Sequence, residues 1–93
     1  MENWYKVVCK QCHRGAGAQE TQTLYYWAGN AMDVLTKYQK TGNVPRDKLP
    51  NVLTPLNAKQ SEVLENFIVN KLELDLETAK KDKIRVLNGN TPV

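Results

Sequence analysis

The stretch Trp4-Tyr5-Lys6-Val7-Val8-Cys9 combines aromatic and β-branched residues with a period of two. Its alternation puts Tyr5, Val7 and Cys9 on one face and the other three residues on the opposite face. This pattern is typical of a β-strand, and residues 21–27 have the same composition. Residues 15–18, with two glycines, favour a loop. We therefore predict an antiparallel hairpin whose connection of about ten residues forms its tip.

Two segments have the spacing of amphipathic helices. Apolar residues at i, i+3, i+4 and i+7 predict a helix over residues 31–40, with Asn30 as its N-cap. A second helix is predicted over residues 58–72, where Asn57 and Gln60 have the spacing of a capping box. The apolar face of this second helix contains Val63, Leu64, Phe67, Ile68 and Leu72.

The remaining segments have weaker patterns. Residues 41–55 contain three prolines and are predicted to be a linker, because proline removes a backbone donor. Residues 75–81 favour a short third helix, and residues 84–87 favour a C-terminal strand. Residues 88–93 are predicted to be a flexible tail.

Together these elements predict a single small α+β domain over residues 1–87. A hairpin alone is not stable in water, so the two amphipathic helices must pack against it. We expect both helices on one face of the hairpin, with Val63, Leu64, Phe67 and Ile68 packed against Val34 and Leu35. The opposite face of the hairpin would then be free to bind a ligand.

Composition and charge narrow the class of protein. The chain has 93 residues, of which 41% are hydrophobic, and a net charge of +3. Residues 1–48 contain seven basic and four acidic residues, whereas residues 49–93 contain six of each. No apolar run is long enough to span a membrane, and no signal peptide is recognised. These features predict a cytoplasmic protein, in which neither cysteine need be bridged.

The segment Cys9-Lys10-Gln11-Cys12-His13 has the C-x-x-C-H pattern to which haem c is attached. At this motif the chain resembles the c-type cytochromes. The resemblance implies thioether bonds from both cysteines to a haem, with His13 as an axial ligand. The chain departs from that family because a strand, rather than a helix, is predicted before the motif. It also lacks a methionine late in the sequence and an export signal.

Residues 8–15 also resemble a zinc knuckle, a β-turn that aims two thiolates at one metal ion. The candidate zinc ligands are Cys9, Cys12 and His13. Structural zinc takes four ligands, so a fourth would have to come from elsewhere, for example from a second copy of the chain. A homodimer is therefore one candidate assembly.

Two further interpretations of the cysteines remain. A C-x-x-C pair can be redox-active, and Lys10, His13 and Arg14 would lower the pKa of a nearby thiol. In the structural interpretation, which we favour, Cys9 packs inward as a small apolar residue while Cys12 and His13 lie in an exposed turn. This interpretation requires no cofactor. No phosphate-binding glycine loop, Ser-His-Asp set or carboxylate pair accompanies the motif, so we expect a protein without catalytic activity.

Binding is the function that these patterns favour. Aromatic residues beside cations on a sheet serve as anchors for protein partners and also stack nucleic-acid bases. The predicted binding residues are Trp4, Lys6, Lys10, His13, Arg14 and Trp27. We expect a small protein-binding module, a stoichiometric regulator or inhibitor of the kind carried by phages or mobile elements. The alternative is a nucleic-acid-binding domain, with or without a zinc-knuckle-like hairpin tip.

Overall fold

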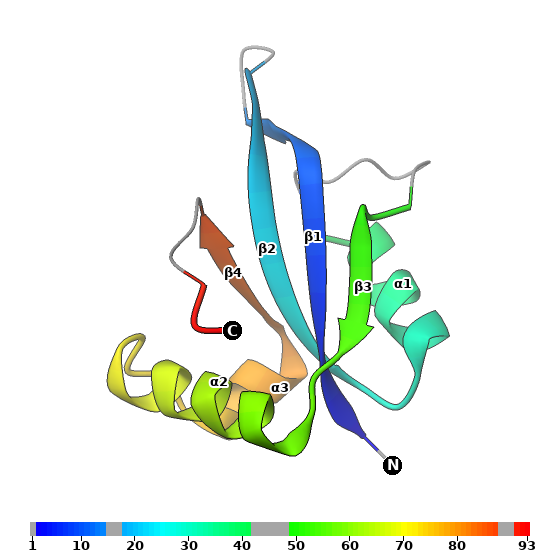
Figure 1. Ribbon diagram of the computed structural model, residues 1–93. Coiled ribbons are helices and arrows are strands. Elements are labelled where there is room, and N and C mark those ends of the chain that lie inside the picture. The colour runs from blue at the N-terminus through cyan, green and yellow to red at the C-terminus, as the bar shows by residue number, and fades with distance from the viewer. Residues whose placement is uncertain (1, 15–17, 42–48, 88–90) are drawn as a thin grey trace.

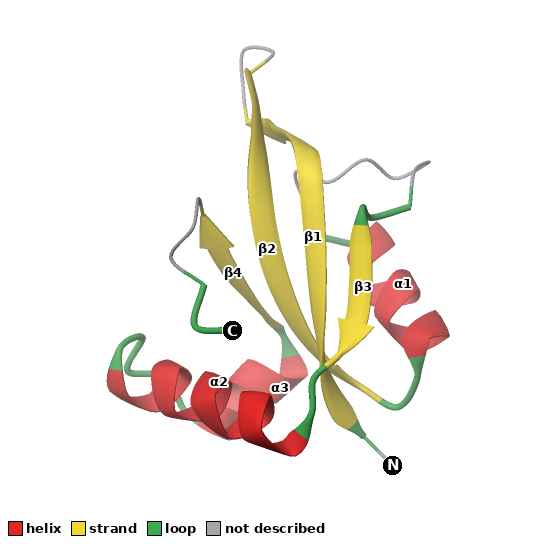
Figure 2. Cartoon of the chain, in the orientation of Figure 1, coloured by secondary structure: helices red, strands yellow, loops and turns green. Residues whose placement is uncertain are grey.

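The computed structural model describes residues 2–14, 18–41, 49–87 and 91–93, with the side chains of residues 11–14, 18–20 and 87 outside the description. Its elements are β1 (Asn3–Arg14), β2 (Ala18–Ala28), α1 (Ala31–Gln39), β3 (Val52–Pro55), α2 (Ala58–Asn70), α3 (Leu76–Lys81) and β4 (Lys83–Leu87). The strands form an antiparallel sheet in the order β3-β1-β2-β4 (Figures 1 and 2). The predicted α+β class, with an N-terminal hairpin packed by helices, is confirmed.

The β1–β2 hairpin is longer than the sequence predicts. Its backbone pairing runs from Asn3 opposite Ala28 to Arg14 opposite Ala18, with an irregularity in register between Cys9 and Cys12. The expected ten-residue connection is therefore wrong, and the Cys-His segment belongs to a strand. A strand tolerates these polar residues because the ladder satisfies the backbone N–H and C=O groups whatever the side chains are.

Strand β3 was not predicted, because it lies within the proline-rich segment assigned as a linker. It pairs with β1 from Val8 opposite Val52 to Tyr5 opposite Pro55. A strand of four residues is too short for a clear alternation, and prolines precede and end it. Since β3 is an edge strand, Pro55 is tolerated there, and its missing N–H limits further pairing.

The helices begin where the capping residues predict. The Asn30 side chain accepts a hydrogen bond from the Asp33 N–H at 2.9 Å, and α1 follows directly. Asn57 and Gln60 form a reciprocal capping box at the start of α2, with distances of 2.8 and 3.1 Å. Both caps satisfy N–H groups that a helix leaves unpaired. Within the described residues, no helix is long and apolar enough to cross a membrane.

The helices pack on opposite faces of the sheet, so the prediction that α1 and α2 share one face is wrong. One face carries an α1-side cluster consisting of Val7, Cys9, Leu24, Tyr26, Ala28, Val34 and Tyr38. The other carries an α2-side cluster consisting of Trp4, Tyr25, Leu56, Leu64, Ile68, Ala79, Ile84 and Val86. Figure 1 shows α2 and α3 together at one end of the sheet and α1 apart from them. Apolar strand residues therefore occupy both faces, as in a sheet covered on each side.

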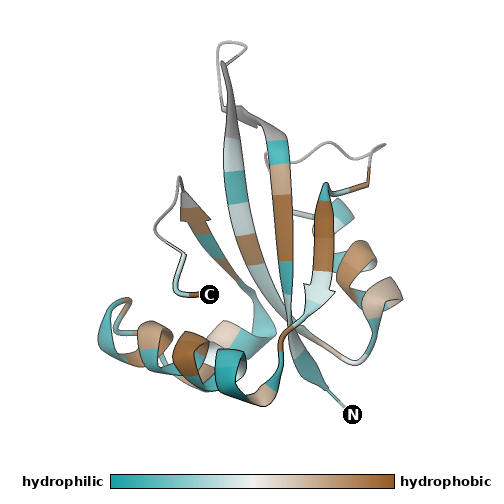
Figure 3. Ribbon diagram, in the orientation of Figure 1, coloured by the Kyte–Doolittle hydropathy of each residue, from teal (hydrophilic) through white to brown (hydrophobic). Residues whose placement is uncertain are grey.

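The apolar face of α2 is only partly as predicted. Leu64 and Ile68 are fully buried and Phe67 packs against the α2-side cluster, but Val63 is 40% exposed. Figure 3 shows hydrophobic and hydrophilic bands alternating along this helix. The predicted contact of these residues with Val34 does not form, because Val34 lies in the α1-side cluster.

The C-terminal segment packs against the sheet. Val93 contacts the α2-side cluster, and the Tyr25 hydroxyl donates a hydrogen bond to the Val93 carbonyl at 2.8 Å. Residues 91–93, which belong to the predicted tail, are half-buried, while residues 88–90 lie outside the described part. Strand β4, predicted at 84–87, extends the sheet beyond β2.

Candidate binding surfaces

A two-stranded ribbon projects beyond the rest of the sheet. Strand β3 pairs with β1 only over residues 5–8, and β4 pairs with β2 only over residues 22–26. Residues 9–14 and 18–21, here called the ribbon, therefore extend past both outer strands (Figure 1). The ribbon carries three of the predicted binding residues, Lys10, His13 and Arg14, and one acidic residue, Glu20.

The base of the ribbon is fixed by two features. The Lys10 N–H donates a hydrogen bond to the Asn51 side-chain oxygen at 2.8 Å, which ties β1 to the segment before β3. Cys9 is buried in the α1-side cluster and is disulfide-bonded, and the chain contains one other cysteine, Cys12. The inward packing predicted for Cys9 is confirmed, whereas the expectation that it is unbridged is wrong.

The disulfide bears on the proposed metal ligands. A sulfur in a disulfide offers no thiolate to a metal ion, so zinc or haem attachment at Cys9 would require the reduced form. Cys12 and His13 have side chains outside the description, so the metal, haem and redox hypotheses for this motif stay predictions.

The two tryptophans do not lie on the ribbon. Trp4 is fully buried, so its predicted role as a surface anchor is wrong. Its indole N–H donates to Glu65 at 3.3 Å, and its ring meets Trp27 edge-on with centroids 5.4 Å apart. Trp27 is half-buried, and the Lys80 ammonium lies 4.1 Å from its ring centroid. Both rings thus hold α2 and α3 on the sheet, through aromatic and cation–π contacts.

Lys6 is also separate from the ribbon. It is half-buried and pairs with Tyr25 and Thr54 on neighbouring strands. Because paired residues share a face, Lys6 lies on the α2-side face of the sheet. Of the predicted binding residues whose side chains are described, only Lys10 is both exposed and on the ribbon.

A pocket with a basic lining lies at the other end of β2. Its volume is about 220 Å³ and it opens to solvent. The residues that line this lysine pocket are Tyr26, Lys37, Lys40, Thr41, Lys81, Asp82 and Lys83. They come from β2, from the end of α1, and from the junction of α3 with β4.

The bottom of the lysine pocket contains two buried hydroxyl groups. The Tyr26 and Thr41 oxygens are 2.7 Å apart, and Thr41 also donates to the Lys37 carbonyl at 2.9 Å. A threonine hydroxyl has one proton to give, so Tyr26 is the donor in the bond with Thr41. Burial is the main cause that raises the pKa of Tyr26 above its ordinary value of 10.0, so this phenol, which is neutral at pH 7 in any case, stays protonated to a higher pH than an exposed tyrosine.

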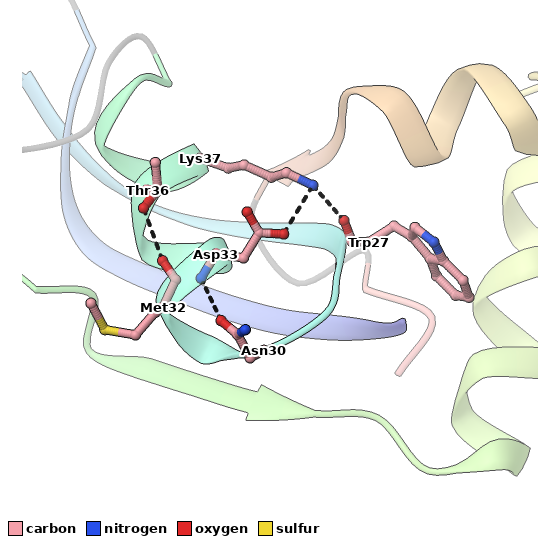
Figure 4. A network of polar contacts seen from close by, with 6 residues as sticks. All are labelled: Trp27, Asn30, Met32, Asp33, Thr36 and Lys37. Atoms are coloured by element: carbon pink, nitrogen blue, oxygen red, sulfur yellow. Dashed lines mark hydrogen bonds and ion pairs between the residues drawn. The ribbon is translucent and has the colours of Figure 1, made fainter. Parts of the chain in front are cut away.

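Lys37 is held in place by the start of α1. Its ammonium donates to the Trp27 carbonyl at 2.7 Å and lies 3.6 Å from Asp33, one helical turn earlier (Figure 4). The Asp33 N–H is in turn bonded to the Asn30 cap, so the helix start and the lysine form one network. Lys83 is likewise 3.3 Å from Asp82.

Sequence reasoning missed the lysine pocket. Lys37 and Lys81 each have a conventional explanation in the sequence, because basic residues are favoured in the last turn of a helix. Only the packing of the α1 end beside the start of β4 brings them together. Comparison of the chain with protein-family models, with curated proteins and with solved structures found no match.

Proposed function

We propose that the protein is a small, non-enzymatic binding module that contacts an acidic, extended segment of a protein partner through the ribbon. The observation that supports this proposal is the projection of residues 9–14 and 18–21 beyond β3 and β4. Such a module would act stoichiometrically, as a regulator or inhibitor does.

The backbone of the ribbon provides the first part of the binding energy. In a two-stranded ribbon, about half of the N–H and C=O groups of each strand point away from the partner strand. An extended peptide can add as a further strand and pair with those groups, which is the mode called β-augmentation. The fixed base at Lys10 and Cys9 favours this mode, because a rigid edge loses less entropy on binding.

The charge of the ribbon provides the selectivity. The ribbon contains Lys10, His13 and Arg14 and one acidic residue, Glu20, so its sequence has an excess of positive charge at neutral pH. Complementary charge mainly increases the rate of association and disfavours partners of like charge, here basic ones. Its effect on affinity is smaller. An acidic extended segment is therefore the partner chemistry that the ribbon fits.

Peptide selection by display tests the proposal. Random peptides are selected on the parent protein and then counter-selected on the variant Lys10→Glu/Arg14→Glu. We expect enrichment of acidic sequences with high β-propensity, and hydrogen exchange should show new amide protection in the ribbon when such a peptide is added. The matched control is Lys59→Glu/Lys71→Glu, two exposed lysines at the ends of α2, which should bind the same peptides as the parent.

Two results would contradict the proposal. One is a selected set of peptides that binds the parent and the ribbon variant equally well. The other is amide protection that falls on α2 or on the lysine pocket rather than on the ribbon. Sedimentation of the unliganded protein identifies the case in which a second copy of the chain occupies the ribbon.

The second candidate is nucleic-acid binding, and the shape of the ribbon favours it. The major groove of B-DNA admits a two-stranded β-ribbon, and basic side chains can neutralise phosphates. Three basic residues predict a shallow dependence of log K on log salt concentration, with a slope of about −2 to −3. Titration of labelled duplex DNA at low salt measures this slope, and no binding there would leave the protein-partner proposal as the better one.

A further inference from the structure

We propose that the lysine pocket is a binding site for a phosphate group, either as inorganic phosphate or as a phosphate monoester. The inference does not rest on the proposed function of the ribbon. Tyr26, in the pocket, is eight residues along β2 from the ribbon residue Ala18, which is roughly 26 Å at the rise of a β-strand.

The charge of the pocket is the first argument. Four lysines and one aspartate line it, which is an excess of three positive charges around about 220 Å³. Lys37 and Lys83 have carboxylates nearby, at 3.6 and 3.3 Å. Among the described residues, Lys40 and Lys81 have neither an ion pair nor a hydrogen bond from their ammonium groups. Cations gathered in this way repel one another unless an anion lies between them.

Helix ends explain only part of this arrangement. Lys37 and Lys81 lie in the last turns of α1 and α3, where a positive charge interacts favourably with the helix dipole. That effect is local to each helix and does not require the two ends to meet. Nor does it account for Lys83, which belongs to β4 and pairs with Tyr26 across the sheet. The convergence of three elements on one hollow is what indicates a ligand.

The chemistry of the lining selects a phosphate group over a carboxylate. The protons of both buried hydroxyls are already engaged, so the ammonium groups are the donors to an anion. A phosphate monoester carries a charge of about −1.5 to −2 near neutral pH and has three strongly accepting oxygens. Its oxygens can accept hydrogen bonds from several lysine ammonium groups that approach from different sides, whereas a carboxylate compensates only one positive charge. The volume is also several times the ~30 Å³ that one water occupies in the liquid.

Nuclear magnetic resonance titration tests this inference directly. The probes are inorganic phosphate, phenyl phosphate and acetate, each compared with sodium chloride at the same ionic strength. We expect saturable shifts of the Tyr26, Thr41 and Lys83 amides with both phosphate probes. The variant Lys40→Gln/Lys81→Gln should weaken phosphate binding by at least about tenfold, because two charged donors are lost.

Control variants keep the result interpretable. Lys40 and Lys81 are exposed, so their replacement by glutamine leaves the core intact, and a thermal melt checks the fold. Lys59→Gln/Lys71→Gln removes the same charge from α2 and should bind phosphate like the parent. Binding of inorganic phosphate but not of phenyl phosphate supports the site and identifies the free anion as its ligand. Equal shifts with chloride or acetate, or an unchanged affinity in Lys40→Gln/Lys81→Gln, would overturn the inference. Failure of the ribbon experiment would leave this result unaffected.

Discussion

Val34 and Ile68 provide a test of the central feature of the fold, the placement of α1 and α2 on opposite faces of the sheet. Both side chains are fully buried, in different clusters. Val34→Ala removes two methyl groups and should cost about 2 kcal/mol, and Ile68→Val should cost about 0.5–1.5 kcal/mol. Because residues on opposite faces share no contacts, the two costs should add to within about 0.5 kcal/mol in the double variant.

Chemical denaturation of the four proteins of this cycle measures the coupling free energy. A domain of this size has about 5–15 kcal/mol of stability, so the double variant remains folded. The positive control for coupling is the pair Leu64→Ala and Ile68→Val, because these residues lie one turn apart on α2 and in one cluster. Their coupling free energy should exceed about 0.5 kcal/mol. Coupling of the same size between Val34 and Ile68 would mean that the helices share one core, and the two-faced packing would be refuted.

Three further predictions concern stability. Burial raises the pKa of Tyr25 to about 12, against an ordinary value of 10.0, so the neutral phenol stabilises the fold below about pH 10 and this contribution is lost as the pH rises toward about 12. Denaturant melts across that interval should show a smaller loss in Tyr25→Phe than in the parent. Glu73, two residues beyond the Lys71 C-cap of α2, has a φ of 54°, so Glu73→Gly should raise the free energy of unfolding by about 0.5–1 kcal/mol. The contrasting variant Glu62→Gly, within α2, should lower it by about 1 kcal/mol. Loss of the capping box in Asn57→Ala should cost about 1 kcal/mol in the same assay, and a cost near zero would contradict its role.

The features predicted correctly from the sequence are those set by neighbours in the chain. Asn30, Asn57 and Gln60 act within one helical turn, so their spacing alone indicates where α1 and α2 begin. The strand composition of residues 4–9 and 21–27 likewise identifies the hairpin. Each of these patterns is local, and the structure it predicts is present in the folded protein.

The features missed depend on contacts between distant segments. Strand β3 exists because β1 offers it an edge, and its four residues contain no periodic pattern of their own. The face on which each helix packs depends on its contacts with distant strands, which amphipathic spacing does not encode. Strand pairing continues as far as Arg14 opposite Ala18 because the backbone groups pair with each other whatever the side chains are. The polar residues in this part of the hairpin have no strand pattern, so in the sequence they resemble a loop.

The two-faced packing also explains why two of the predicted binding residues, Trp4 and Trp27, lie away from the ribbon. On a hairpin covered on one side, Trp4 would have been exposed, and an exposed tryptophan beside lysines is a plausible binding anchor. Because α2 and α3 cover that face, Trp4 is buried and Trp27 packs edge-on against it. Aromatic composition by itself therefore does not distinguish a binding surface from a second core.

The distribution of positive charge also depends on the packing of distant segments. The excess of positive charge in the sequence lies within residues 1–48, which include the basic hairpin residues predicted to bind a partner. In the fold, the lysine pocket alone has four lysines and one aspartate, an excess of three, which equals the net charge of the whole chain. The rest of the molecule thus has nine basic and nine acidic residues. Two of the pocket lysines come from the end of α1 and its C-cap, and two from the α3–β4 junction, so neither half of the sequence reveals this concentration of charge. An anion that enters this pocket would meet four ammonium groups and one carboxylate, an attraction that salt screens only in part.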